Sequence, residues 1–205
     1  GLLNGKPHNV GPLVNVYNAA TAKLLASRGA ETICLPPELP FSSVETIVAE
    51  SPGIDFEVFA FGRMPLAISA RCAHARSKGK IKDNCLFVCG EEPDGLPVKT
   101  LDRQSFLALN GVQTVSHTCQ ALVAELADLA ASGIASIRLS PQDCNMVAVA
   151  RLYRSVLDGQ LEAEEAIEQL RAIYPAAPLS NGFHHAREGA AWVARARDVA
   201  SGAVA

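Results

Sequence analysis

Two segments of the chain repeat the same order of residue types. "SRGAETICLPPE" (residues 27–38) and "ASGIASIRLSPQ" (residues 131–142) each run from a predicted helix end through a glycine and an apolar strand to a proline turn. The glycines, Gly29 and Gly133, suit the left-handed position that ends a helix. Repetition of helix, glycine, strand and proline predicts parallel strands joined by helical crossovers.

The same alternation of predicted strands and helices extends along much of the chain. Apolar and β-branched runs predict strands, and apolar residues at spacings of three and four predict helices. Strands are predicted at 10–18, 31–39, 54–62 and 134–141, with shorter pieces in 105–116; helices are predicted at 19–28, 41–50, 118–133, 145–159 and 162–174. Asn18 is expected to cap the first helix, and Ser42 and Glu45 have the spacing of a capping box for the second.

The predicted fold class is α/β, as part of a TIM-like (β/α)₈ barrel. Such a barrel needs about 200 to 250 residues or more, and this chain has 205, some of them in an irregular cysteine segment. We therefore expect one domain over residues 1–205, incomplete at its N-terminus and forming the C-terminal part of a longer chain. A doubly wound open sheet is the alternative, although no G-x-G-x-x-G follows a strand.

Composition restricts the function classes. The net charge of −3 does not favour a nucleic-acid binder, for which a basic balance is expected. No apolar run approaches the ~18 residues that cross a bilayer. Six cysteines are few for a secreted disulfide scaffold of this length. We expect a cytoplasmic protein whose clustered thiols serve metal or redox chemistry.

Three of the six cysteines lie in one basic, irregular segment, at residues 62–95. Cys72, Cys85 and Cys89 are separated by twelve and three residues, with lysines and arginines between the first two. Thiolates that can reach one metal select zinc or an iron–sulfur cluster, and nearby cations would stabilise an anionic cluster. Spacing alone leaves zinc and iron–sulfur both open, and solvation remains the simpler explanation for each single charge.

Four other residues are pocket candidates. Glu38 follows a predicted strand end, where barrel enzymes place their chemistry; a cap or surface ion pair is the alternative. Arg63 and Arg71 flank the cysteine segment and could bind an anionic substrate, neutralise a cluster or be solvated. His117 could be a general acid or base, or a hydrogen-bonded structural residue. The pair at residues 184–185 suggests a metal, but no nearby carboxylate completes a site, so the two histidines are expected to be structural.

The stretch "EVFAFGRMPLAISARCAHARSKGKIKDNCLFVCGEEPDG" (residues 57–95) resembles the signature of the U32 family, proteins named as peptidases. "SARC", "KDNC" and "VCG" carry the resemblance. It extends through "LPPELP", "NGVQT", "LSPQD" and "SNGFHH", and so covers nearly all of the chain. Within the family the chain is most similar to the UbiV-type branch, the V subunits of oxygen-independent ubiquinone hydroxylation.

That resemblance implies a 4Fe–4S cluster and a homologous U-type partner in a heterodimer. The pair would hydroxylate the ring of a quinone precursor with prephenate as the oxygen donor. Carried over, Cys72, Cys85 and Cys89 would be cluster ligands, with the fourth cysteine upstream of this chain. Three further thiols are less favoured as the fourth ligand, and packing is their expected role: Cys34, Cys119 and Cys144.

Two other function classes stay open. The family name suggests a peptidase or collagenase-like protein, but the chain has no H-E-x-x-H, no G-x-S-x-G and no clear Cys–His nucleophile pair. A non-catalytic metal-binding scaffold for a partner is the third class. No acid–base pair stands out, so catalytic residues cannot be assigned from the sequence.

Overall fold

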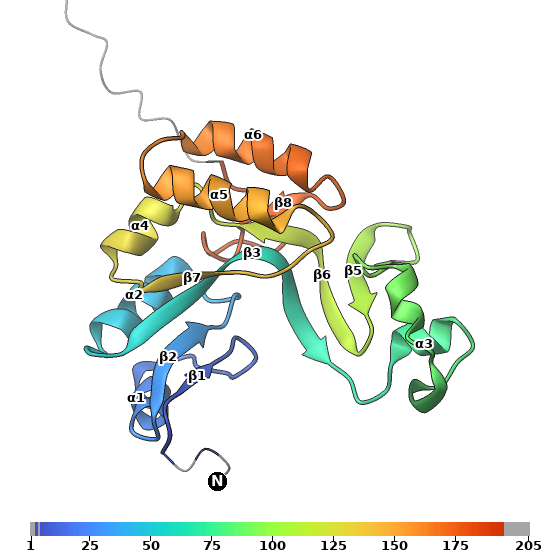
Figure 1. Ribbon diagram of the computed structural model, residues 1–205, viewed down its shortest axis with the longest axis horizontal. Helices are drawn as coiled ribbons and strands as arrows, with labels where there is room; N and C mark the ends of the chain where they lie inside the picture. The colour runs from blue at the N-terminus through green and yellow to red at the C-terminus, as the bar shows by residue number, and fades with distance from the viewer. Residues whose placement is uncertain (1–2, 4, 195–205) are drawn as a thin grey trace, which may run out of the picture.

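Three parallel strands joined by two helices form the first part of the computed structural model, which describes residue 3 and residues 5–194. The elements are β1 (His8–Val10), α1 (Ala19–Ala26), β2 (Ala30–Leu35), α2 (Phe41–Ala49) and β3 (Asp55–Ile68). β1 pairs with β2 and β2 pairs with β3, both in parallel register. The repeated β/α unit predicted from the sequence is therefore confirmed here (Figure 1).

Local signals place the ends of the first helix correctly. The Asn18 side chain accepts a hydrogen bond from the Thr21 backbone N–H at 2.8 Å and caps α1. Gly29 has a φ of +100°, and a Cβ there would lie 2.7 Å from the Gly5 carbonyl oxygen. The strand predicted at 10–18 is wrong beyond Val10, where Gly11 and a proline without an N–H begin a loop. The capping box of α2 is also absent, since its N-cap is Pro40.

β3 is the longest strand and changes partners along its length. On the edge opposite β2, its residues Glu57–Phe61 pair in parallel with β7 (Ser136–Leu139). From Phe61 to Ile68 the same strand pairs antiparallel with β6 (Gln113–Ala121). β6 continues the sheet through β5 (Ser105–Asn110) to β4 (Leu96–Lys99), and β8 (Leu179–Ser180) pairs with its end.

The predicted TIM-like barrel is wrong. The eight strands form one open, mixed sheet in the order β1-β2-β3-β6-β5-β4, with β7 beside β3 and β8 beside β6. A closed barrel requires pairing to return to the first strand, but the path through the described residues ends at β1 and at β4. The second half of β3 enters an antiparallel ribbon instead, which also rules out the doubly wound parallel alternative. Only the coarser assignment, mixed α/β, holds.

The later helices cover the sheet near β7 and β8. α4 (Leu126–Ala131), α5 (Met146–Leu157) and α6 (Ala163–Ile173) lie together on one side in Figure 1. The buried Tyr153 of α5 donates to the Ala60 carbonyl of β3 at 2.9 Å, which joins this layer to the sheet. The helix predicted at 118–133 is half wrong, because residues up to Ala121 pair with β3 and leave only the last turns helical.

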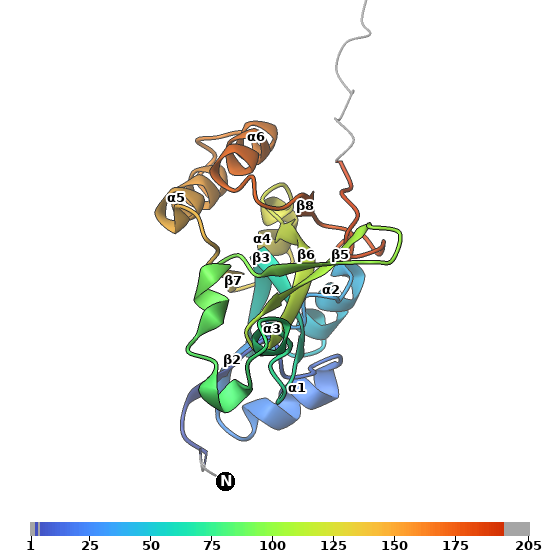
Figure 2. The same ribbon diagram turned by 90° about the vertical axis from the view of Figure 1, so that its right-hand side faces the viewer.

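The cysteine segment forms a small unit at the far end of the antiparallel ribbon. It contains α3 (Ala73–Ser77) and two 3₁₀ turns, η1 (Lys82–Asn84) and η2 (Val88–Glu91), between β3 and β4. Figures 1 and 2 show α3 away from the layer of α4, α5 and α6. The sheet therefore carries helical crossovers at one end and the cysteines at the other.

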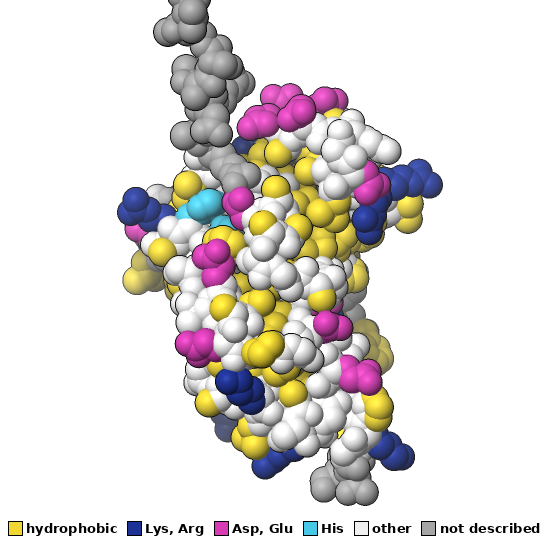
Figure 3. All heavy atoms as spheres, turned by 90° about the vertical axis from the view of Figure 1, so that its left-hand side faces the viewer, with side chains coloured by type: hydrophobic (Ala, Val, Ile, Leu, Met, Phe, Trp, Pro, Cys, Tyr) yellow, Lys and Arg dark blue, Asp and Glu magenta, His cyan; other side chains and the backbone are white. Residues whose placement is uncertain are grey.

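Apolar side chains also reach the surface. Figure 3 shows hydrophobic side chains spread over the face that it presents. Between α4, β7 and α5 lies a cavity of about 340 Å³, lined mainly by apolar residues such as Leu126, Leu129 and Ile137. Within the described part of the chain, no helix combines the length and apolarity that crossing a membrane requires.

Gly62 permits the close approach of the β7–α5 loop to β3, and its replacement tests this packing. Its φ is +125°, and an added Cβ would lie 2.8 Å from the Ser140 Cβ. We expect Gly62→Ala to lower the free energy of unfolding by about 2 to 4 kcal/mol, combining backbone strain with overpacking. Urea denaturation followed by circular dichroism measures the loss.

Gly53→Ala is the matched control, because Gly53 also has a positive φ (+81°) but has no atom within 4 Å of the added Cβ. It should lose only the strain contribution, about 1 to 2 kcal/mol. Equal losses in the two variants would mean that contact with Ser140 does not restrict residue 62.

Candidate functional site

The three cysteines of the basic segment lie within the same small unit. Cys72 is the N-cap of α3, is buried, and its Sγ accepts the Ala75 backbone N–H at 3.3 Å. Cys85 packs against the apolar cluster that Cys72 forms with Ala75 and Val88. Cys89 lies in η2, where its Sγ would be 3.8 Å from a Cβ placed on Gly111 in the β5–β6 turn. The fold thus places thiols that are up to 17 residues apart in the sequence within one small unit.

Three thiols in one unit are suitable ligands for a soft metal, but their side chains do not converge on one point. Thiolates are the ligands of zinc and of iron–sulfur clusters. Among the described residues, however, no three Cys, His, Asp or Glu side chains converge as a group that could hold a metal ion. Leu86 and Phe87, between two of the thiols, both have left-handed φ values of 53° and 54° and are 75% and 84% exposed. Packing holds this part of the segment weakly.

A carboxylate ties α3 to the segment that follows η2. Glu92 Oε1 lies 2.6 Å from Lys78 Nζ, and its Oε2 lies 2.8 Å from Nε2 of the buried His74. The other ring nitrogen of His74 faces the Leu109 carbonyl at 3.0 Å. Hydrogen bonding to Lys78, and then to His74, lowers the pKa of the Glu92 carboxyl. This network fixes the position of α3, and with it the Cys72 end of the cysteine segment.

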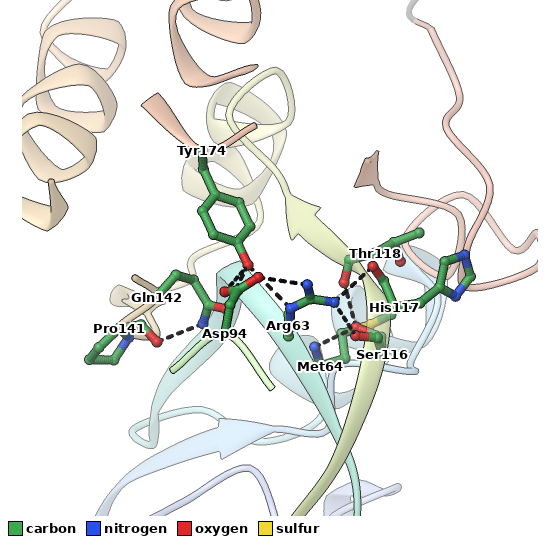
Figure 4. Close-up of polar contacts among 9 residues, drawn as sticks. All are labelled: Arg63, Met64, Asp94, Ser116, His117, Thr118, Pro141, Gln142 and Tyr174. Carbon is green, nitrogen blue, oxygen red and sulfur yellow. Dashed lines mark hydrogen bonds and ion pairs between the residues drawn. The ribbon is translucent and has the colours of Figure 1, made fainter. Parts of the chain in front are cut away.

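Arg63, one of the pocket candidates, is the centre of a second polar cluster (Figure 4). Its Nη2 forms an ion pair with Asp94 Oδ2 at 2.7 Å, and its Nε donates to Tyr174 Oη at 3.2 Å. Its Nη1 donates to the carbonyls of Ser116 and His117, at 3.0 and 2.8 Å. One side chain therefore joins β3, β6, the loop before β4 and the end of α6.

The Arg63 guanidinium has little capacity left for a ligand. Of its five N–H groups, one on Nε, two on Nη1 and one on Nη2 already have acceptors. The Tyr174 hydroxyl donates to Asp94. Burial, and then that hydrogen bond, raise the pKa of Tyr174, so the phenol stays protonated. The expected role of Arg63 in binding an anionic substrate is not favoured by these contacts.

A polar cavity of about 330 Å³ opens beside this cluster. Its walls come from four separate parts of the chain: β3, the loop before β4, the β5–β6 hairpin and the loop after β7. The polar residues that line it include Arg63, Asp94, Asn110, Gln113, Gln142 and Asp143. Carboxylate and amide groups predominate, so the cavity presents mainly hydrogen-bonding groups and negative charge.

The other pocket candidates lie in different surroundings. Glu38 accepts a hydrogen bond from Tyr17 on the loop after β1. Arg71 is exposed, and its backbone N–H donates to Ser69 Oγ at 3.1 Å. His117 contributes its carbonyl to Arg63, while its Nδ1 lies 3.0 Å from the Phe106 carbonyl. Of the four candidates, the hydrogen bonds described here join only Arg63 and His117.

Sequence reasoning missed the acidic partners. Asp94 lies within the cysteine segment, but nothing in the sequence connects it to Arg63 or to Tyr174. Glu125 is fully buried, and its Oε1 lies 2.9 Å from His185 Nε2 and 2.9 Å from Asn181 Nδ2. A carboxylate from 60 positions earlier therefore lies beside His185, a contact that the sequence did not predict.

The remaining cysteines lie outside the small unit. Cys34 and Cys119 are fully buried in β2 and β6, and burial raises the pKa of each thiol to about 12. Cys144 precedes α5 and lies 3.7 Å from Met146 through their sulfur atoms; burial raises its pKa as well. Each environment disfavours the thiolate form that metal ligation requires.

Acid should loosen the cysteine unit through Glu92. Its pKa is lowered in the folded protein, so its stabilising contribution is present above the unfolded value of about 4.3 and is lost as the pH falls through the lower, folded pKa. We expect the protection factors of the α3 amides, which correct exchange rates for their intrinsic dependence on pH, to fall as the pH is lowered from about 6 to about 3.

Glu92→Gln should lower the protection factors of the α3 amides already at about pH 6. It should also remove most of their further fall as the pH is lowered. Glu91→Gln is the control, because Glu91 is mostly exposed and lies 3.3 Å from Lys78. An unchanged acid response in Glu92→Gln would assign the effect to another group.

A comparison with protein families covers nearly the whole chain. The family model for peptidase family U32 matches residues 5–194, which include the β/α units, the cysteine segment and the Arg63 cluster. No solved structure matches the chain. Because the match covers nearly the whole chain, this protein belongs to peptidase family U32.

Proposed function

We propose that this chain is a 4Fe–4S-binding subunit of oxygen-independent ubiquinone synthesis, of the UbiV type. In this proposal it hydroxylates the ring of a quinone precursor together with a homologous U-type subunit, and prephenate donates the oxygen. The observation that carries the proposal is that Cys72, Cys85 and Cys89 all belong to one small unit, in which Cys85 packs against the apolar cluster of Cys72. Their spacing within residues 57–95 is the part of the sequence that most resembles this branch of the family.

The surroundings of the cysteines support an anionic cofactor. The segment between Cys72 and Cys85 contains Arg76, Lys78 and Lys80, and no Asp or Glu before residue 83. A cluster held by thiolates carries negative charge, so nearby cations stabilise it and raise its reduction potential. The backbone N–H of Ala75 already donates to Cys72 Sγ, the kind of bond that stabilises a thiolate.

Binding a cluster requires rearrangement between Cys85 and Cys89. The conformation of Leu86 and Phe87 favours this rearrangement. Each left-handed residue stores on the order of 1 to 3 kcal/mol of strain, which a change of the turn would release. Their side chains are also largely exposed, so few contacts are lost when the turn changes. In the proposal, Cys72 stays anchored by α3 and the other two thiols move.

The chain then provides three ligands, and the fourth is the upstream cysteine implied by the family resemblance. The cluster would supply electron transfer. The chain's own residues have the task of holding it and shielding it from water. Val88, which clusters with Cys72, and Val112, which packs against that cluster, provide an apolar wall for this purpose. No residue of this chain is assigned an acid–base role.

Two cysteine variants test the proposal in opposite directions. The chain is reconstituted under argon with ferrous iron and sulfide, and dithiothreitol is present so that its thiolate can occupy the fourth position. We expect Cys85→Ala to lose most of its iron and sulfide, because removing one of three protein thiolates leaves an iron without a ligand. Cys144→Ala should retain both, since that thiol lies outside the cysteine unit.

Ring hydroxylation should follow the same ranking when the U-type partner, a quinone precursor and prephenate are supplied to each variant. Full iron content in Cys85→Ala together with loss in Cys144→Ala would show that the ligand set is wrong. Retention of iron and activity by both variants would refute the cluster assignment itself.

A further inference from the structure

Two cavities of the protein share a wall. The polar cavity beside Arg63 has a neighbour of about 250 Å³, and both are lined by Arg63, Gln113, Val115 and Ser140. A side chain that lines two cavities lies between them, and four such residues make the cavities adjoining compartments. Each compartment is near the lower size limit of small-molecule sites, which is about 300 Å³, and together they exceed it.

The compartments lie where the sheet changes its direction of pairing. The loop at Gly11–Val14 follows β1, Ser140 follows β7, and β3 leaves its parallel neighbours near Gly62. In open α/β sheets, ligands bind outside the carboxyl ends of the parallel strands, at the point where the topology switches. The position of the compartments therefore matches that of a ligand site.

The polar compartment disfavours anions. Asp94 and Asp143 both line it, whereas Arg63 is its one cation among the described lining residues. The Arg63 side chain is only 10% exposed, and its charge is already matched by Asp94 at 2.7 Å. A carboxylate entering here would meet Asp143 without a free cation to compensate. Hydroxyl or amide groups, in contrast, find acceptors and donors in Asn110 and Gln113.

The second compartment is largely apolar. Leu13 and Val14 line it from the loop after β1, and both are about half exposed in the free chain. Phe59 and Val115 form its floor from the sheet. Besides Arg63, it is lined by one cation, Arg138, which is paired with Glu57 at 2.6 Å. A ligand lying here would remove apolar surface from water without meeting an unpaired charge.

We propose that the two compartments form one binding site for an uncharged, amphipathic small molecule. Its hydroxyl-bearing head lies in the polar compartment, against Asp94 and Asp143, and its apolar end covers Leu13 and Val14. This inference stands apart from the proposed cluster, because no cysteine lines either compartment. Failure of the iron experiment would leave it standing.

Three probes test the head and the tail separately: 4-butylphenol, 4-butylbenzoate, which changes the head, and phenol, which lacks the tail. Binding to the full chain is measured by isothermal titration calorimetry at pH 7, near neutrality, where only the benzoate is charged. We expect 4-butylphenol to bind at least about tenfold more tightly than either other probe, because the benzoate meets like charge and phenol lacks the apolar end. Equal or tighter binding of the benzoate would overturn the proposal, as would failure of 4-butylphenol to bind.

Two variants locate the site. Asp143→Asn removes a carboxylate and should therefore reduce the difference in affinity between the two butyl probes. Asp55→Asn makes the same charge change at the far end of β3 and should leave that difference unchanged. Leu13→Asp should weaken 4-butylphenol by about tenfold and leave phenol nearly unchanged. Its side chain is half exposed, so folding is not at risk. If neither Asp143→Asn nor Leu13→Asp changes binding, the probe lies elsewhere and the proposed site is wrong.

Discussion

The Arg63 guanidinium holds together parts of the chain that lie far apart in the sequence. Through four hydrogen-bonding contacts it links β3 to β6, to the loop before β4 and to the end of α6. It lies just beyond Gly62, where β3 leaves the parallel strands and enters the antiparallel ribbon. A partly buried ion pair therefore lies where the β/α part meets the ribbon that leads to the cysteine unit, and the two-part cavity opens beside it.

Local elements were predictable because their signals are local. The cap at Asn18, the stop at Gly29 and the parallel β1–β2–β3 pairing follow from residues within a few positions of each element. The path of the sheet was not predictable in this way. β3 reads as a strand of nine residues up to Gly62, but it runs on to Ile68 because β6, some fifty residues later, supplies its partner. The same pairing keeps Cys119 out of the helix that the apolar spacing predicted.

The candidate site shows the same division. The three cysteines were identified by their spacing, and the fold places them in one unit although it does not converge them on a point. Arg63 was identified for its position beside that segment. Its charge is matched by Asp94, so its contacts favour a structural role over binding of an anion. The carboxylate of Glu125 beside His185 was missed, since contacts over 60 residues leave no mark in a single sequence.

The central claim, that thiolates of this chain hold an iron–sulfur cluster, is tested most directly by metal and acid-labile sulfide analysis of the wild-type chain, purified without oxygen and with dithiothreitol as the fourth thiolate. Zinc and iron–sulfur sites can use the same cysteines, but only a cluster contains inorganic sulfide. We predict that iron and sulfide are found together in equal amounts, and that both are lost on exposure to air. Zinc without sulfide, stable in air, would contradict the account.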